Sequence, residues 1–141
     1  MAQNIQSLWS PDIKATVMSP LTILKGQVEA LILLTGGVLV AQIVEELEEG
    51  NVSLSLDLIA PALKGSRHRI LKVTHGHDMP YPAKLEAEIF RSGSYSWSWA
   101  PTDEAFTDRV AQVLRSPQVS SIAQSLIARA NEALAAEADV Q

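Results

Sequence analysis

Two neighbouring segments carry the clearest alternation of apolar and polar residues in the chain: Val52-Ser53-Leu54-Ser55-Leu56-Asp57-Leu58 and Arg69-Ile70-Leu71-Lys72-Val73-Thr74-His75. The apolar face lies on even positions in the first segment and on odd positions in the second. A period of two residues predicts half-buried strands, because successive side chains of a strand point to opposite faces of the sheet. Each segment is therefore expected to place one apolar face on a core.

The residues Lys64-Gly65 lie between these two strands and predict the turn of a hairpin. A two-residue turn sets Leu58 opposite Leu71 and Asp57 opposite Lys72, so that the apolar faces coincide and opposite charges meet on the other face. Because lysine is not the preferred first residue of a type I′ turn, a bulged loop with a shifted register is the alternative.

Two further segments downstream, residues 84–90 and 95–99, also alternate and predict antiparallel strands. In the expected register, Glu88 joins Asp57 and Lys72 in one charged row across three strands. These segments extend the hairpin into a meander.

Residues 38–47, upstream of the hairpin, are rich in branched side chains. We expect a strand here, because Gly36-Gly37 separates this segment from the helical pattern before it. A helix continuing through 38–47 is the alternative, since its glutamates are good helix formers.

Three segments have helical spacing. The first begins at Ser19-Pro20, a hydroxyl cap followed by proline at the first helical position, and spans roughly residues 20–34. The second follows Thr102-Asp103, and the third follows Ser116-Pro117 and has one wide apolar face. This order predicts an α+β fold: an antiparallel meander sheet of four to five strands packed against one N-terminal and two C-terminal helices.

The chain has no internal repeat or linker, so residues 1–141 are expected to form a single domain. We interpret residues 1–18 as an N-terminal arm that packs through Trp9, Ile13 and Val17, and we expect a tail from about 137–141 to fray. The expected core residues are Leu24, Val28, Leu31, Leu56, Leu58, Leu71, Val73, Ile89, Phe106, Val110, Ile122 and Leu126.

The composition argues against several classes of protein. With no cysteine, the chain has no disulfide scaffold, no thiolate zinc site and no cysteine nucleophile. Eleven lysine and arginine residues stand against sixteen acidic ones, and this net charge of −5 argues against nucleic-acid binding, where phosphate neutralisation supplies most of the affinity. We expect a cytoplasmic protein with no membrane segment, and no cofactor, because phosphate-loop and dinucleotide motifs are missing.

The sharpest chemical motif is His75-Gly76-His77-Asp78. Histidines two residues apart at a strand end point the same way, and imidazole is a common metal ligand. With Asp78 or Glu86 as a further ligand, His75 and His77 would support a metal-dependent hydrolase. We favour the alternative, in which His75 closes one end of the core and His77-Asp78 caps a loop, because a third ligand is not convincingly placed.

Three aromatic residues, Tyr95, Trp97 and Trp99, face one way on the last strand and alternate with serines. Such a row can bind a small ligand or a glycan, since each ring offers an apolar face. We favour the alternative that the rings seal the core against a helix while the serines face solvent, because the chain has few other aromatic residues.

The loop Met79-Pro80-Tyr81-Pro82 is stiffened by two prolines. A rigid loop that presents Met79 and Tyr81 suits the recognition of another protein. The same loop could equally serve only as a stiff connection between two strands, and we favour this interpretation.

These observations favour a non-enzymatic protein-interaction domain, or an accessory or regulatory subunit, because no nucleophile is accompanied by a base. The apolar run Leu31-Ile32-Leu33-Leu34 covers more than one face of the first helix. Either this helix lies beneath the others, or a partner or a second copy covers an exposed patch. The edge strand of the sheet is a second docking surface. The hydrolase and the small-ligand or glycan binder remain the alternatives.

Overall fold

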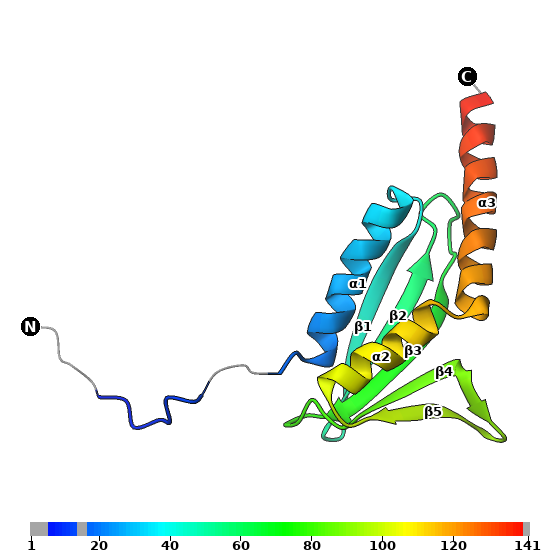
Figure 1. The fold of residues 1–141 in the computed structure, drawn as a ribbon. Helices are drawn as coiled ribbons and strands as arrows, with labels where there is room; N and C mark the ends of the chain where they lie inside the picture. The colour runs from blue at the N-terminus through cyan, green and yellow to red at the C-terminus, as the bar shows by residue number, and fades with distance from the viewer. Residues whose placement is uncertain (1–5, 14–16, 140–141) are drawn as a thin grey trace, which may run out of the picture.

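The computed structural model describes residues 6–13 and 17–139. Within these residues the elements follow one another in the order α1 (Pro20–Thr35), β1 (Val40–Glu48), β2 (Asn51–Ile59), β3 (His68–Gly76), β4 (Ala83–Ser92), β5 (Tyr95–Ala100), α2 (Asp103–Leu114) and α3 (Pro117–Asp139). The strands form an antiparallel sheet in the order β1-β2-β3-β4-β5, and the helices lie on one face of it (Figure 1). This is the expected α+β arrangement.

The ends of α1 confirm the signals in the sequence. The Ser19 side chain accepts a hydrogen bond from the Thr22 N–H at 3.3 Å, and Pro20 is the first helical residue. Gly36 and Gly37 adopt left-handed backbone angles, with φ of 62° and 84°, that end the helix. The chain then enters β1 as a strand, so the alternative of a continuous helix through residues 38–47 is wrong.

The register between β2 and β3 differs by two residues from the expected one. Leu56, rather than Leu58, lies opposite Leu71. The connection is a longer loop, in which the Ser66 hydroxyl bonds both the N–H and the carbonyl of Ala60. A shift of two residues keeps every side chain on its original face, and the two apolar faces therefore still coincide.

A β-bulge at Ile70 shapes the far end of this hairpin, where Asp57 lies opposite Arg69. The extra residue reverses the alternation, and Arg69 thereby reaches the sheet face that points away from the helices. On that face the fully buried Asp57 carboxylate binds Arg67 at 2.9 Å and Arg69 at 3.1 Å. We call this sheet face, which the helices leave uncovered, the open face.

The ladder between β3 and β4 is short. It covers three residue pairs, of which Lys72 opposite Glu86 is the last, and β4 then bends away from β3 (Figure 1). The charged row expected through Asp57, Lys72 and Glu88 is therefore wrong. Ile89 lies on the bent part of β4 and is 37% exposed, which is why it does not belong to the core as expected.

The core lies between the helices and the apolar face of the sheet. Of the other expected core residues, Val28, Leu31 and Ile122 are partly buried against it. The rest are buried: Leu24, Leu56, Leu58, Leu71, Val73, Phe106, Val110 and Leu126.

The N-terminal arm does not pack as expected. Trp9, Ile13 and Val17 are 79%, 65% and 49% exposed, because the helices and loops already close the core without them. The described arm meets the body at Met18, which donates to the Asp103 carboxylate and accepts from the Tyr81 hydroxyl. Parts of the predicted arm (1–5 and 14–16) and of the predicted tail (140–141) lie outside the described residues.

Replacing Leu126 by alanine should lower the free energy of unfolding by about 2–5 kcal/mol, because the side chain is 2% exposed and its loss leaves a cavity. Urea unfolding followed by circular dichroism measures this change. Leu47→Ala is the matched control: this leucine is 69% exposed, and its loss should cost less than about 0.5 kcal/mol. Equal effects of the two substitutions would contradict the burial of α3.

Replacing Asp57 by asparagine should lower the free energy of unfolding by about 1–3 kcal/mol, because the buried negative charge is lost and an NH2 donor replaces one of the two oxygens that accept from the arginines. Glu86→Gln is the control, since it removes a partly exposed ion pair with Lys84 and should cost less than about 1 kcal/mol. An Asp57→Asn variant as stable as the parent would show that the carboxylate does not hold the hairpin.

Candidate functional site

The aromatic residues of β5 lie on the open face. Ser98 lies opposite Leu85 of β4, and the side chain of Leu85 is fully buried in the core. Ser98 therefore faces the core as well. Trp97 and Trp99, the neighbours of Ser98 along the strand, point to the other side of the sheet. Tyr95 shares that face by the same alternation. It is 62% exposed and Trp99 is 49% exposed, while Trp97 is half-buried. The expectation that these rings seal the core is therefore wrong.

The serines of β5 face the helices instead of solvent. Ser98 accepts a hydrogen bond from the Arg109 side chain of α2 at 3.0 Å. Ser96 lines a cavity together with Val113 of α2. Because these serines are small, α2 can pack close to β5, and the large rings project from the other side.

The three rings form a packed ridge rather than a flat platform. Tyr95 and Trp97 have ring centroids 5.8 Å apart with planes at 82°, and Trp97 and Trp99 are 5.7 Å apart at 81°. The Lys84 ammonium lies 5.3 Å from the Trp97 ring centroid, which is a cation–π geometry. Edge-to-face contacts are a preferred arrangement of aromatic pairs, and they support the rings as a rigid unit. We call Tyr95, Trp97 and Trp99 the aromatic ridge.

A groove of about 490 Å³ lies at the Trp99 end of the ridge. It brings together several residues singled out in the sequence: His75, Asp78, Met79, Tyr81 and Trp99. Sequence reasoning did not connect these motifs, because only the pairing of β3, β4 and β5 brings the end of β5 to the β3–β4 loop.

The predicted metal ligands are not assembled into a metal centre. His75 Nδ1 lies 2.8 Å from the Gly76 carbonyl oxygen, and His77, which is exposed, donates its backbone N–H to the Gly50 carbonyl. Asp78 shares the groove with His75, but His77 does not line it. Across residues 6–13 and 17–139, no cluster of three or more histidine, aspartate, glutamate or cysteine residues could hold a metal ion.

Tyr81 anchors its loop, while Met79 is the exposed member of the predicted pair. The Tyr81 hydroxyl donates to the Met18 carbonyl at 2.7 Å, and its ring packs edge-on against Phe106. Burial raises the pKa of Tyr81 to about 12, and the Asp103 carboxylate acts in the same direction. The Tyr81–Pro82 peptide bond is cis. Met79 is 59% exposed and therefore available for a contact.

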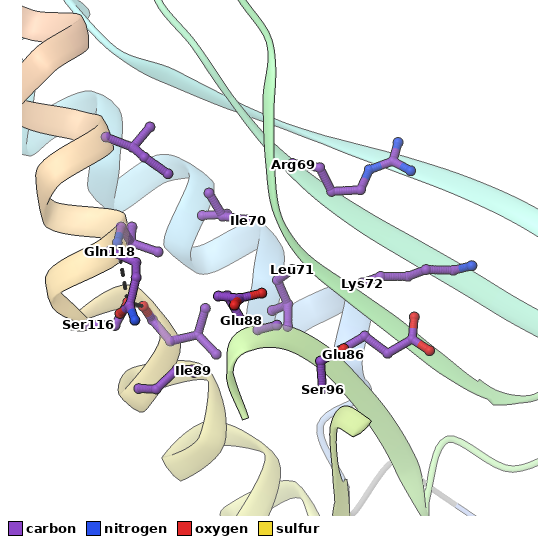
Figure 2. A pocket seen from close by; sticks show the side chains of 14 residues that line it. Arg69, Ile70, Leu71, Lys72, Glu86, Glu88, Ile89, Ser96, Ser116 and Gln118 are labelled. Carbon is purple, nitrogen blue, oxygen red and sulfur yellow. Dashed lines mark hydrogen bonds between the residues drawn. The ribbon is translucent and has the colours of Figure 1, made fainter. Parts of the chain in front are cut away.

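A second cavity, of about 360 Å³, opens where β4 bends away from β3 (Figure 2). Arg69 and Lys72 point away from it on one side, and Ser116 and Gln118 border it on the helical side. The Ser116 hydroxyl donates to the Val113 carbonyl at 2.7 Å and accepts from the Val119 N–H at 3.3 Å, as the cap of α3. No sequence pattern predicted this cavity, because the early end of a strand ladder creates it.

A third cavity, of about 350 Å³, lies between α1 and α3. Leu31 and Leu34 of α1 form one wall, and Val119 and Ala123 of α3 form the other. The floor is formed by three apolar residues of the sheet, Leu56, Leu58 and Ile70. We call this feature the α1–α3 trough.

Every buried side-chain nitrogen or oxygen atom in the described part of the chain has a hydrogen-bond partner. Unpartnered buried side-chain polar groups are therefore missing from the interior of this part of the chain. None of the helices in the described ranges is both long enough and apolar enough to span a membrane.

Comparisons with protein-family models, curated proteins and solved structures find no match to this chain.

The stability of the protein should depend on Tyr81 at high pH. Because its pKa is raised from 10.0 to about 12 in the fold, the unfolded chain releases the phenolic proton first as the pH rises. The contribution of Tyr81 to the stability of the fold is complete below the pKa that Tyr81 has in the unfolded chain. This contribution is lost as the pH rises through the pKa that Tyr81 has in the folded protein. The melting temperature of the parent should therefore fall more steeply above about pH 9 than that of Tyr81→Phe. Parallel pH profiles of the two proteins would contradict this.

Proposed function

We propose that this chain is a non-enzymatic protein-interaction domain, acting as an accessory or regulatory subunit, in which β5 captures an extended peptide by strand addition. The observation that carries the proposal is the exposure of the aromatic ridge on an edge strand. The outer side of an edge strand offers backbone donors and acceptors, and β5 is last in the sheet order. A peptide added there would bond to the backbone and contact the ridge with alternate side chains.

The two edges of the sheet differ in a way that favours β5. The other edge strand, β1, carries Glu45, Glu46 and Glu48, and charges on an edge discourage pairing with another strand. β5, with the sequence YSWSWA, carries no charge. This difference supports β5, rather than β1, as the edge that receives the added strand.

The charges beside the ridge indicate the kind of peptide. Although the whole chain has a net charge of −5, the open face carries Arg69, Lys72 and Lys84 close to β4 and β5. Asp57 pairs with Arg69 and Glu86 pairs with Lys84, but within the described residues no carboxylate lies within 4.0 Å of the Lys72 ammonium. We therefore propose a peptide with acidic residues between apolar ones. The groove beside Trp99 and Met79 would receive an apolar side chain from one end of the peptide.

The binding of a small ligand or glycan is the second candidate, because the exposed rings are available for it. The perpendicular packing of neighbouring rings leaves no continuous flat surface, which favours a peptide over a stacked sugar chain. A metal-dependent hydrolase has no ligand cluster among the described residues to support it. We also propose that the protein acts in the cytoplasm, a reducing compartment with which its lack of cysteine is compatible.

Selection from a displayed library of random ten-residue peptides tests the proposal. The selected peptides should combine apolar and acidic residues, and their binding should protect the backbone amides of residues 95–100 from hydrogen exchange. Trp99→Ala should weaken binding by roughly 30-fold, as the loss of an aromatic anchor does. Trp9→Ala is the matched control, because this tryptophan lies on the arm, and it should leave the affinity unchanged.

Two results would overturn the proposal. The first is a set of peptides that bind without protecting the amides of β5. The second is a glycan array in which oligosaccharides bind in a Trp99-dependent way while no peptide does, which would assign the ridge to the second candidate.

A further inference from the structure

The α1–α3 trough is an apolar surface that the described part of the chain leaves uncovered. Its floor residues Leu56 and Leu58 are buried, but Leu34 on its wall is 83% exposed. Beside it on α1, Ile32 and Leu33 are 40% and 84% exposed. Of the two explanations for the apolar run in α1, the structure therefore shows an exposed patch rather than a helix beneath the others.

The C-terminal part of α3 is a helix end that the body of the protein does not cover. A helix of 23 residues is about 34 Å long, and the last buried residue of α3 is Ala130. Beyond it the helix projects from the body, at the same end of the molecule as the C-terminal end of α1 (Figure 1). The apolar stripe nevertheless continues into this projecting end with Ala133 and Leu134, and Leu134 is 47% exposed.

We propose that the trough receives the projecting end of α3, residues 131–139, from a second copy of this chain. Each copy then supplies one trough and one helix end, and a two-fold dimer satisfies both reciprocally. The proposal does not rest on peptide binding by β5, because the trough lies on the helical face and the ridge lies on the open face.

The shapes of the two surfaces are complementary. Residues 131–139 have the sequence NEALAAEAD, with alanine at four positions and Leu134 as the single large apolar side chain. Alanine makes a slender helix that can approach a groove between two other helices closely. Leu134 can then enter the cavity of about 350 Å³ that Leu31, Leu34 and Ala123 border.

The charges are complementary as well. The projecting end carries Glu132, Glu137 and Asp139 and no basic residue. The trough carries Arg115 at the end of α2, and no carboxylate among the described residues lies within 4.0 Å of its guanidinium group. An acidic helix end that binds in the trough would supply a carboxylate partner for Arg115, whereas a purely apolar ligand would not.

Light scattering and sedimentation of the full chain at several concentrations test the dimer. The parent should be dimeric in the micromolar range, and Leu34→Asp and Leu134→Asp should each raise the dissociation constant at least roughly tenfold. Both leucines are substantially exposed, so circular dichroism should show that the variants keep the fold. Leu47→Asp, which places the same charge on another exposed leucine, outside the trough, should stay dimeric.

Mixing the two variants provides the sharpest test. Leu34→Asp has a defective trough and Leu134→Asp has a defective helix end, so each homodimer loses both contacts. A heterodimer of the two keeps one intact trough with one intact helix end, and the mixture should associate more strongly than either variant alone.

Three results would overturn the inference: a parent that stays monomeric throughout, a dimer that both aspartate variants leave intact, or a mixture no more associated than its components. None of these results bears on hydrogen exchange in β5, so the dimer and the peptide site succeed or fail separately.

Discussion

The arrangement of the sheet depends on one buried charge, the carboxylate of Asp57. A charge taken out of water is costly unless opposite charges bind it, and here Arg67 and Arg69 do so. Arg69 reaches the carboxylate because the bulge at Ile70 reverses the alternation of β3. The same bulge turns Ile70 toward the helices, where it borders both the α1–α3 trough and the cavity between β3 and β4. One irregularity therefore connects the ion pairs of the open face with the cavities of the helical face.

The two faces of the sheet suit two kinds of contact. On the helical face, α1 and α3 leave an apolar trough between them, and the same chain carries a projecting helix end that matches it in size and charge. On the open face, basic side chains lie beside an aromatic ridge on an uncharged edge strand. Because the surfaces lie on opposite sides, a dimer would leave the ridge accessible. The aromatic ridge and the α1–α3 trough are the surfaces on which the two proposals rest.

Much of the fold was predictable because its signals are local. Ser19-Pro20 and Gly36 mark the ends of α1 within about one residue, since capping depends on neighbouring backbone groups. The site was less predictable. Trp99, Met79 and His75 were each singled out, but their meeting in one groove depends on strands distant in sequence.

The sequence by itself determined the element order, the strands of the meander and, away from the bulges, which residues of a strand share a face, because these follow from local periodicity and caps. Only the tertiary structure decided which of the two faces meets the helices. Alternation places Tyr95, Trp97 and Trp99 together, but it is the pairing of Ser98 with the buried Leu85 that turns them outward. Likewise, a period of two residues cannot distinguish registers that differ by two, since both keep the apolar faces together. In the register that the structure adopts, Asp57 lies opposite Arg69, and its buried carboxylate binds Arg67 and Arg69.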